Sequence, residues 1–315
     1  MTLVSLNRAH SVRKITSPSV SVVVPALNEE RNLPHVFARL PRDVAQVILV
    51  DGGSTDRTVA VARELWPAIE IVQQTRTGKG NALACGFAAC TGDIIVMIDA
   101  DGSTDPAEIP DFVRTLVDGA DFAKGSRFRE GGGSDDITPL RRLGNAGLNG
   151  VANVLFGTSF TDLCYGYNAF WRRLLPSLDL PDTGTPAPAD GRKLWGDGFE
   201  IETLINVRAA GQRLRIEEVP SHEAPRLYGE SNLRTFRDGA RVLRTMLAEF
   251  SRRRRIARTR IESTEVAPTP FPVELDRQIE ALRSLNRHRI PAPGGYATAS
   301  AAGVFHGSMS LSKEV

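Results

Sequence analysis

The first third of the chain alternates between short apolar runs and segments with helical spacing, and this alternation limits the fold more than any other feature. The runs, with the residues that end them, are VSVVVPA (20–26), QVILVDGGS (46–54), IEIVQQ (69–74) and DIIVMIDAD (93–101). Continuous apolar runs of this length are typical of strands that are buried on both faces. Strands that alternate with helices through short loops predict an α/β fold, with a mostly parallel central sheet flanked by helices.

Polar side chains follow the ends of these runs. Asn28 comes just after the first run, and Asp51 ends the second. Asp99 and Asp101 end the fourth. Ligands of open α/β sheets bind beyond the carboxyl ends of the strands. We therefore expect these side chains to line one crevice.

The fourth run ends on two carboxylates that are separated only by Ala100. Asp99 and Asp101 repel each other, so a positive group is expected between them. Mg²⁺ and Mn²⁺ bind hard oxygen ligands, and a carboxylate pair leaves coordination positions free for phosphate oxygens. The alternative is a turn that carries two solvated acids. The position of the pair beside Asp51 favours the metal site.

Two further features limit the kind of nucleotide site. The first run is followed by PALNEE instead of GxGxxG, which argues against a dinucleotide fold and a dehydrogenase. Asp51 is suited to accept a hydrogen bond from a ribose hydroxyl; the alternative is an acid in a turn beside Gly52. In TGKGNAL (77–83), Lys79 lies at a helix start and suits a diphosphate, although the Walker A pattern is absent. The alternative for this segment is a simple helix-entry turn.

The composition excludes several other classes of protein. A formal net charge of +2 is too small to indicate a nucleic-acid partner. Cys85, Cys90 and Cys164 form no CxxC pair, which argues against a disulfide framework or a zinc site and fits a reducing compartment. We find no signal peptide and no uncharged apolar window of about 20 residues. We expect a cytoplasmic protein with at most peripheral contact at the inner face of a membrane.

Four segments, taken in order, resemble family 2 inverting glycosyltransferases, which have the GT-A nucleotide-sugar fold. The segments are VVVPALNEERNL, VILVDGGSTDRT, TGKGNALACGF and DIIVMIDADGS. The sub-group that they resemble most is the dolichyl/polyprenyl-phosphate hexose synthase group, which includes dolichol-phosphate mannose synthase. The resemblance covers about residues 20–245 and implies three parts. These are an N-terminal extension (1–18), a GT-A domain (19–250, with a nucleotide-binding half to about 125 and an acceptor half after it) and a basic, Pro/Ser/Ala-rich tail (251–315).

The resemblance also implies which residues hold the donor. Asp99 would act mainly on the nucleotide, and Asp101 on a divalent metal, Mg²⁺ or Mn²⁺. Lys79 would lie near the donor diphosphate. The remaining donor-binding positions implied by the family are Pro25, Ala26, Asn28, Glu29, Asp51 and Ala100.

Further matches in the second half imply an acceptor or phosphate site. KGSRF (124–128) places Arg127 at a donor or acceptor phosphate, and TDLCYGYNAFWR (161–172) places Asp162 near it. RLYGESNL (226–233) resembles a phosphate-binding element in which Arg226 and Ser231 match. Asn232 stands where the family has a lysine, which weakens the inferred charge. The alternative for both arginines is a surface salt bridge.

The segment WGDGFEIET (195–203) contains a candidate general base. Transfer to an alcohol needs a base for the hydroxyl proton, and Asp197 is the first candidate, with Glu200 second. Alternatively, Asp197 or Glu200 is an acid that stabilises the N-terminus of a helix. A lipid phosphate is already an anion and needs no base. The late His222 resembles a third metal ligand of other GT-A enzymes, against the alternative of a structural histidine.

Residues 233–250 predict an amphipathic helix that is followed by RRRR at 252–255. Such a helix suits an anionic membrane surface, but an ordinary helix packed on the core has the same periodicity. The apolar stripe consists of Leu233, Phe236, Ala240, Leu243, Leu247 and Phe250, and the basic stripe of Arg234, Arg237, Arg241 and Arg244.

Together these features predict a metal-dependent inverting hexosyltransferase. It would use a nucleotide-sugar of the GDP-mannose or UDP-glucose type and a polyprenyl phosphate acceptor. The alternative keeps the donor and uses a soluble hydroxyl acceptor, with Asp197 as base. A non-catalytic nucleotide-sugar-binding protein is disfavoured because Asp51, Asp99 and Asp101 are all present. A nucleotidyltransferase is disfavoured because its Gly-rich first loop is absent.

Overall fold

The structure is a computed structural model that describes residues 17–229 and 235–264 of the 315. It divides into two compact units, Met1–Arg258 and Thr259–Val315. Every element described below belongs to the first unit, apart from the last turns of one helix.

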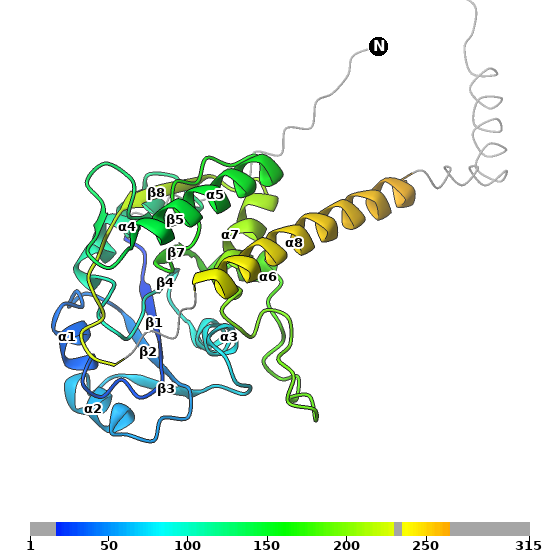
Figure 1. Ribbon diagram of the computed structural model, residues 1–315. Coiled ribbons are helices and arrows are strands. Elements are labelled where there is room, and N and C mark those ends of the chain that lie inside the picture. Colours follow the sequence, from blue (N-terminus) through cyan, green and yellow to red (C-terminus); the bar gives the residue numbers. More distant parts are fainter. Residues whose placement is uncertain (1–16, 230–234, 265–315) are drawn as a thin grey trace, which may run out of the picture. The chain divides into compact units, whose positions relative to one another are not determined.

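A seven-stranded sheet forms the centre of the described chain, with the order β3-β2-β1-β4-β7-β5-β8 (Figure 1). β7 runs antiparallel to both of its neighbours, β4 and β5, and all other pairs are parallel. The predicted mostly parallel sheet is therefore confirmed. The strands are β1 (Val20–Ala26), β2 (Gln46–Asp51), β3 (Glu70–Gln73), β4 (Ile94–Met97), β5 (Phe122–Ser126), β7 (Asn168–Trp171) and β8 (Ile216–Pro220).

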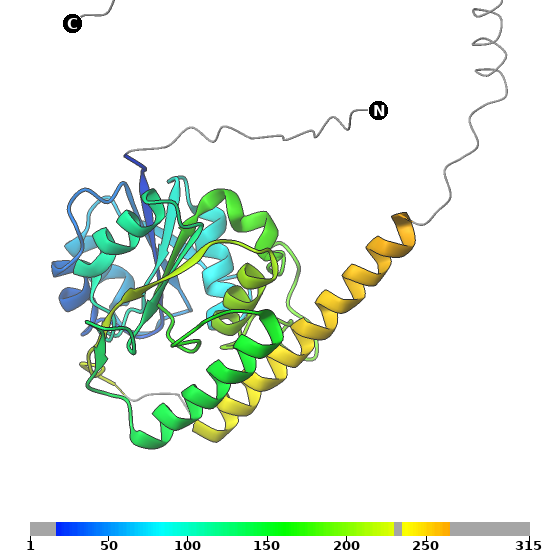
Figure 2. The same ribbon diagram turned by 90° about the horizontal axis from the view of Figure 1, so that it is seen from above.

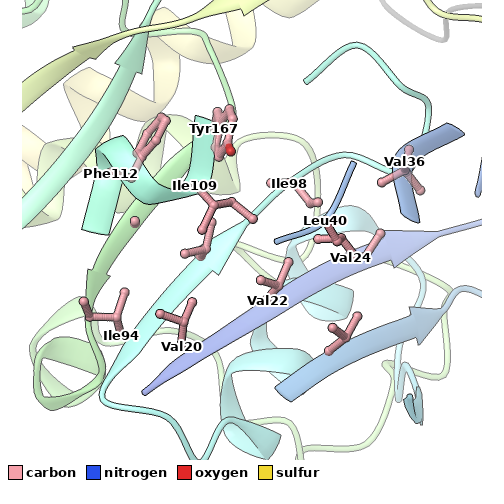
Figure 3. Packing of buried hydrophobic residues seen from close by; sticks show 14 of the residues in the cluster. Val20, Val22, Val24, Val36, Leu40, Ile94, Ile98, Ile109, Phe112 and Tyr167 are labelled. Atoms are coloured by element: carbon pink, nitrogen blue, oxygen red, sulfur yellow. The ribbon is translucent and has the colours of Figure 1, made fainter. Parts of the chain in front are cut away.

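Helices cover both faces of this sheet, because successive side chains of a strand point to opposite faces. Val22 and Val24 of β1 belong to one apolar cluster, and Val23 belongs to another. Figure 3 shows part of the first cluster, including Phe112 of a covering helix. The first face is covered by α1 (Leu33–Ala38), α2 (Thr58–Leu65) and α4 (Ile109–Val117), and the second by α3 (Lys79–Ala89), α6 (Leu175–Leu178) and α7 (Ile201–Gly211).

Two long helices, α5 (Pro139–Phe156) and α8 (Thr235–Thr264), lie side by side (Figures 1 and 2). A third apolar cluster joins them, in which the rings of Phe156 and Phe250 meet edge to face at 6.1 Å. The smaller elements are the strand pair β6 (Gly133–Ser134) and β9 (His222–Glu223) and the 3-10 turns η1 (Pro106–Glu108) and η2 (Arg172–Leu174).

Helix α8 differs from its predicted form. It extends to Thr264, beyond the domain boundary expected at 250, while Leu233 lies outside the described residues. It packs on the core through Met246, which is buried, but Leu243 and Leu247 are 39% and 49% exposed. The helix therefore has a core-facing side and, beside it, an exposed apolar side.

Candidate active site

The ends of β1 and β2 bring Asn28 and Asp51 to one edge of the sheet, as the sequence predicts. The two strands are in register at Ala26 and Asp51. The backbone N–H of Asn28 donates to Ser54 Oγ at 3.0 Å, and Ser54 N–H donates to Asp51 at 3.1 Å. Burial raises the pKa of Asp51, but hydrogen bonds from Ser54 and Gln73 outweigh burial and hold the pKa below its ordinary value. Asp51 is therefore an ionised acceptor at neutral pH.

Lys79 neutralises the first carboxylate of the Asp99–Asp101 pair. Its Nζ lies 2.6 Å from Asp99 Oδ1 and 2.5 Å from Glu202 Oε1. Burial raises the pKa of Asp99 to about 6; Lys79 opposes this rise, and Asp101 and Glu202 add to it. Burial lowers the pKa of Lys79, but the two carboxylates raise it above its ordinary value, so the side chain remains a cation.

Arg226 neutralises the second carboxylate. Its Nη2 lies 3.1 Å from Asp101 Oδ2, and its Nη1 lies 3.1 Å from Glu29 Oε1. The other oxygen of Asp101 accepts from the backbone N–H and the hydroxyl of Ser103 at 3.0 and 2.7 Å. The positive charge expected beside the acid pair is thus supplied from two elements, α3 and the loop that follows β9.

The acid pair has the donor chemistry that a divalent cation requires. Mg²⁺ is commonly held by one or two carboxylates together with substrate phosphates, and Asp99 and Asp101 offer such a pair. The sequence predicts His222 as a third ligand; in the structure, this side chain contacts another acid. His222 Nε2 lies 3.0 Å from Asp135 Oδ2, and within residues 17–229 and 235–264 no group of three or more His, Cys, Asp and Glu side chains could hold a metal.

Asp197, the first candidate for the base, is buried in an ion pair that the sequence does not predict. Its carboxylate is 1% exposed and accepts from Arg76 Nε at 2.7 Å and Nη2 at 2.9 Å. Glu200, the second candidate, is also buried, and one of its oxygens accepts from the backbone N–H groups of Gly196 and Gly198. Asp197 and Glu200 are thus both hydrogen bonded to other groups of the protein.

The start of α3 is closed by the same loop. The carbonyl oxygen of Asp197 accepts from the backbone N–H groups of Gly80 and Asn81 at 2.9 and 3.3 Å. A Cβ atom on Gly80 would lie 1.8 Å from the carbonyl oxygen of Gly196, so only glycine fits there. The sequence predicts a diphosphate at this helix start; in the structure, the chain itself occupies the position.

Arg127 and Asp162 also form a buried pair in place of the predicted phosphate contact. Arg127 donates to both oxygens of Asp162, at 2.7 and 2.9 Å, and to Glu223 at 2.8 Å. Its side chain is 5% exposed and that of Asp162 is fully buried. Arg127 is thus held by two carboxylates, which fix its side chain within the fold.

The remaining predicted residues divide between the strand ends and the undescribed part of the chain. Pro25 and Ala26 lie in β1, and Ala100 lies in the loop after β4, while their predicted contact with the donor stays a prediction. Ser231 lies outside the described residues. Arg76 and Glu202 are the functional partners that sequence reasoning missed. One sequence feature pointed to Glu202, which is among the acids of WGDGFEIET. No feature pointed to Arg76 beyond its position before TGKG.

A mostly parallel sheet with acids at neighbouring strand ends is the arrangement of GT-A glycosyltransferases. The family model for glycosyl transferase family 2 matches residues 21–178. The chain therefore belongs to glycosyl transferase family 2, and it is a glycosyltransferase enzyme with the GT-A fold.

Relatives and solved structures agree with this assignment. An uncharacterized glycosyltransferase of Mycobacterium tuberculosis is 41% identical over 223 residues, which are 68% of this chain and 89% of the relative. A dolichol-phosphate mannosyltransferase of Pyrococcus furiosus is 28% identical over 225 residues, 68% of this chain but only 59% of that relative. Glucosyl-3-phosphoglycerate synthase of Mycobacterium tuberculosis, solved with Mn²⁺, UDP and its product, is 25% identical, with a TM-score of 0.56 over 75% of this chain and 81% of that structure.

Proposed function

We propose that this enzyme transfers a hexose from a nucleotide-sugar to a polyprenyl phosphate, with inversion and with Mg²⁺ or Mn²⁺. The observation that carries the proposal is the state of Asp197 and Glu200, which are both buried and both hydrogen bonded within the protein. An alcohol acceptor needs a positioned base, whereas a phosphate oxygen is already an anion. An acceptor that brings its own negative oxygen suits a site without a free base.

The strand ends suit the donor half of this reaction. Asn28 and the ionised Asp51 would hold the nucleoside, as the family resemblance implies. Asp99 and Asp101 would hold the divalent cation, which when bound neutralises the charge that develops on the departing nucleoside diphosphate. Lys79 keeps Asp99 ionised and in place, because its Nζ bridges Asp99 and Glu202. The acceptor phosphate oxygen forms a bond to the anomeric carbon as the bond to the diphosphate breaks.

A soluble hydroxyl acceptor is the second candidate. It is supported by the structural similarity to glucosyl-3-phosphoglycerate synthase, which has been solved with UDP-glucose and phosphoglyceric acid, a soluble compound. Under this alternative, the ion pair between Asp197 and Arg76 would have to open to release a base.

Direct transfer assays distinguish these acceptors. We expect labelled hexose from UDP-glucose or GDP-mannose to reach farnesyl phosphate, giving an acid-labile phosphodiester, and not to reach 3-phosphoglycerate or simple alcohols. Omission of the divalent metal should abolish transfer, and its restoration should recover it. Transfer to a hydroxyl acceptor while farnesyl phosphate remains inert would exclude the proposed acceptor.

We further propose that the enzyme works while bound peripherally to an anionic membrane. No helix in the described part of the chain is long and apolar enough to cross a bilayer. On α8, the exposed Leu243 and Leu247 lie beside the exposed Arg244 and Arg254. A helix side with apolar and basic residues suits the interface of anionic lipids.

Vesicle flotation tests the membrane proposal. The protein should float with vesicles that contain phosphatidylglycerol and remain in solution with neutral vesicles. Replacing Leu243 and Leu247 by serine should lower partition about tenfold or more, since burial of a leucine contributes about 1.5–3 kcal/mol. The core-facing side of α8 is unchanged in this variant, so its melting temperature serves as the control. Equal partition of the native and variant chains would exclude α8 as the contact.

A further inference from the structure

We propose that a cavity between the loop 193–200 and α8 receives the phosphate end of the prenyl phosphate acceptor. This inference rests on the proposed function. The cavity has a volume of about 340 Å³, which lies within the usual range for ligand pockets. It is separate from the acids at the strand ends. Its lining includes Lys193, Trp195, Phe199, Glu200, Arg241 and Arg244.

The charged groups of the cavity favour an anion. Lys193 and Arg244 are exposed, and neither forms an ion pair with any residue that the structure describes. Arg241 pairs with Asp238 at 2.6 Å. The only acid in the lining, Glu200, is already held by backbone N–H groups. Two unpaired cations and one occupied carboxylate leave the cavity with a positive surplus, which a phosphate would balance.

The aromatic groups of the cavity favour an apolar tail on that anion. Trp195 and Phe199 are 39% and 42% exposed, although large apolar side chains are usually buried. Trp195 Nε1 donates to Glu249 Oε1 at 3.1 Å, which fixes the indole while its ring remains accessible. A free phosphate would leave both rings uncovered. A prenyl phosphate would cover the rings and neutralise the cations with one molecule.

One cavity residue, Lys193, lies close to the segment that leads into α3. Lys193 Nζ lies 3.4 Å from the position that a Cβ atom would take on Gly78. Gly78 directly precedes Lys79, whose Nζ contacts Asp99. We therefore place the phosphate at Lys193, beside the segment that leads into α3, and the prenyl chain over Trp195 and Phe199.

Steady-state kinetics with farnesyl phosphate, without vesicles, tests the assignment. In the variant Lys193→Gln/Arg244→Gln, the KM for farnesyl phosphate should rise about tenfold or more, because each cation loses a charge-assisted contact with phosphate. The KM for the nucleotide-sugar should stay within about twofold, since no donor-binding residue changes. Arg237→Gln is the matched control for Arg244→Gln alone, because it removes one exposed arginine of the same helix two turns earlier and outside the cavity.

A second variant tests whether the aromatic rings bind the prenyl chain of the acceptor. Phe199→Ser should raise the KM for farnesyl phosphate more than that for dimethylallyl phosphate, whose tail is short. Binding of farnesyl phosphate to the donor-free protein, followed by tryptophan fluorescence, gives the same comparison without turnover.

The outcomes separate the two proposals. If the native enzyme transfers no sugar to farnesyl phosphate, the proposed function fails, and the fluorescence titration alone decides whether the cavity binds a prenyl phosphate. If transfer occurs but the Lys193→Gln/Arg244→Gln variant keeps the native KM, the cavity assignment is overturned. A rise in KM for Arg237→Gln equal to that for Arg244→Gln alone would also overturn it, because the effect would then be one of overall charge.

Discussion

Asp101→Asn is expected to lower the rate of sugar transfer about 10²–10³-fold, the loss typical of removing one preorganised electrostatic group. The substitution keeps the size of the side chain and an oxygen that can accept from Ser103. It removes the negative charge that would hold a divalent cation. Arg226 also loses one of its two partners, but Glu29 still pairs with it.

Thermal unfolding with and without nucleotide measures the metal contribution separately from turnover. A ligand at a hundredfold excess over its dissociation constant stabilises a protein by about 2.7 kcal/mol. For Asp101→Asn, we expect the part of this shift that depends on Mg²⁺ or Mn²⁺ to disappear. Asp105→Asn is the control, because it removes the same charge from the same loop, where Asp105 pairs with Arg39. A full metal-dependent shift in Asp101→Asn would exclude Asp101 as a ligand.

The sequence predicts the strands of the first half of the chain well because its signals are local. Apolar runs mark β1, β2 and β4, and the residues that end these runs lie at the carboxyl edge of the sheet. Asp51 and Asp99 could therefore be placed from their positions after a strand. The antiparallel direction of β7 was not predicted, since a run of four residues says nothing about strand direction.

The ion pairs could not be predicted because they join distant segments. Arg76 and Asp197 are 121 positions apart, and Arg127 and Glu223 are 96 apart. A motif match suggests that an acid or an arginine is present for chemistry, but the partner decides whether its charge is available. For Asp197 and Arg127, the partner lies on another element and neutralises the charge.

Helix α8 illustrates a different limit. The period of its apolar residues is the same for a membrane-facing helix and for a core helix. In the structure, Met246 is buried and Leu247 is exposed, so both faces contain apolar residues. The sequence alone does not show which of the two faces packs on the core, because that depends on where the core lies.

Asp197→Asn is expected to destabilise the protein by about 3–5 kcal/mol, because it leaves the buried guanidinium of Arg76 without its counter-charge. Nearly the whole ion pair is buried, with side chains 2% and 1% exposed. The double variant Arg76→Met/Asp197→Leu should recover much of this loss, since apolar side chains of similar size can replace a buried ion pair. Denaturant unfolding of the native chain, Arg76→Met, Asp197→Leu and the double variant measures the coupling between the two residues.

Transfer by the same variants decides between a structural and a catalytic role for Asp197. If its role is to close the loop over the start of α3, the folded double variant should keep transfer to farnesyl phosphate within about tenfold of the native rate, because the acceptor phosphate needs no base. If Asp197 is the base, the double variant should be stable but lose transfer by at least 10²-fold, the usual contribution of general base catalysis. A stable and inactive double variant would therefore contradict the phosphate acceptor and support a hydroxyl acceptor.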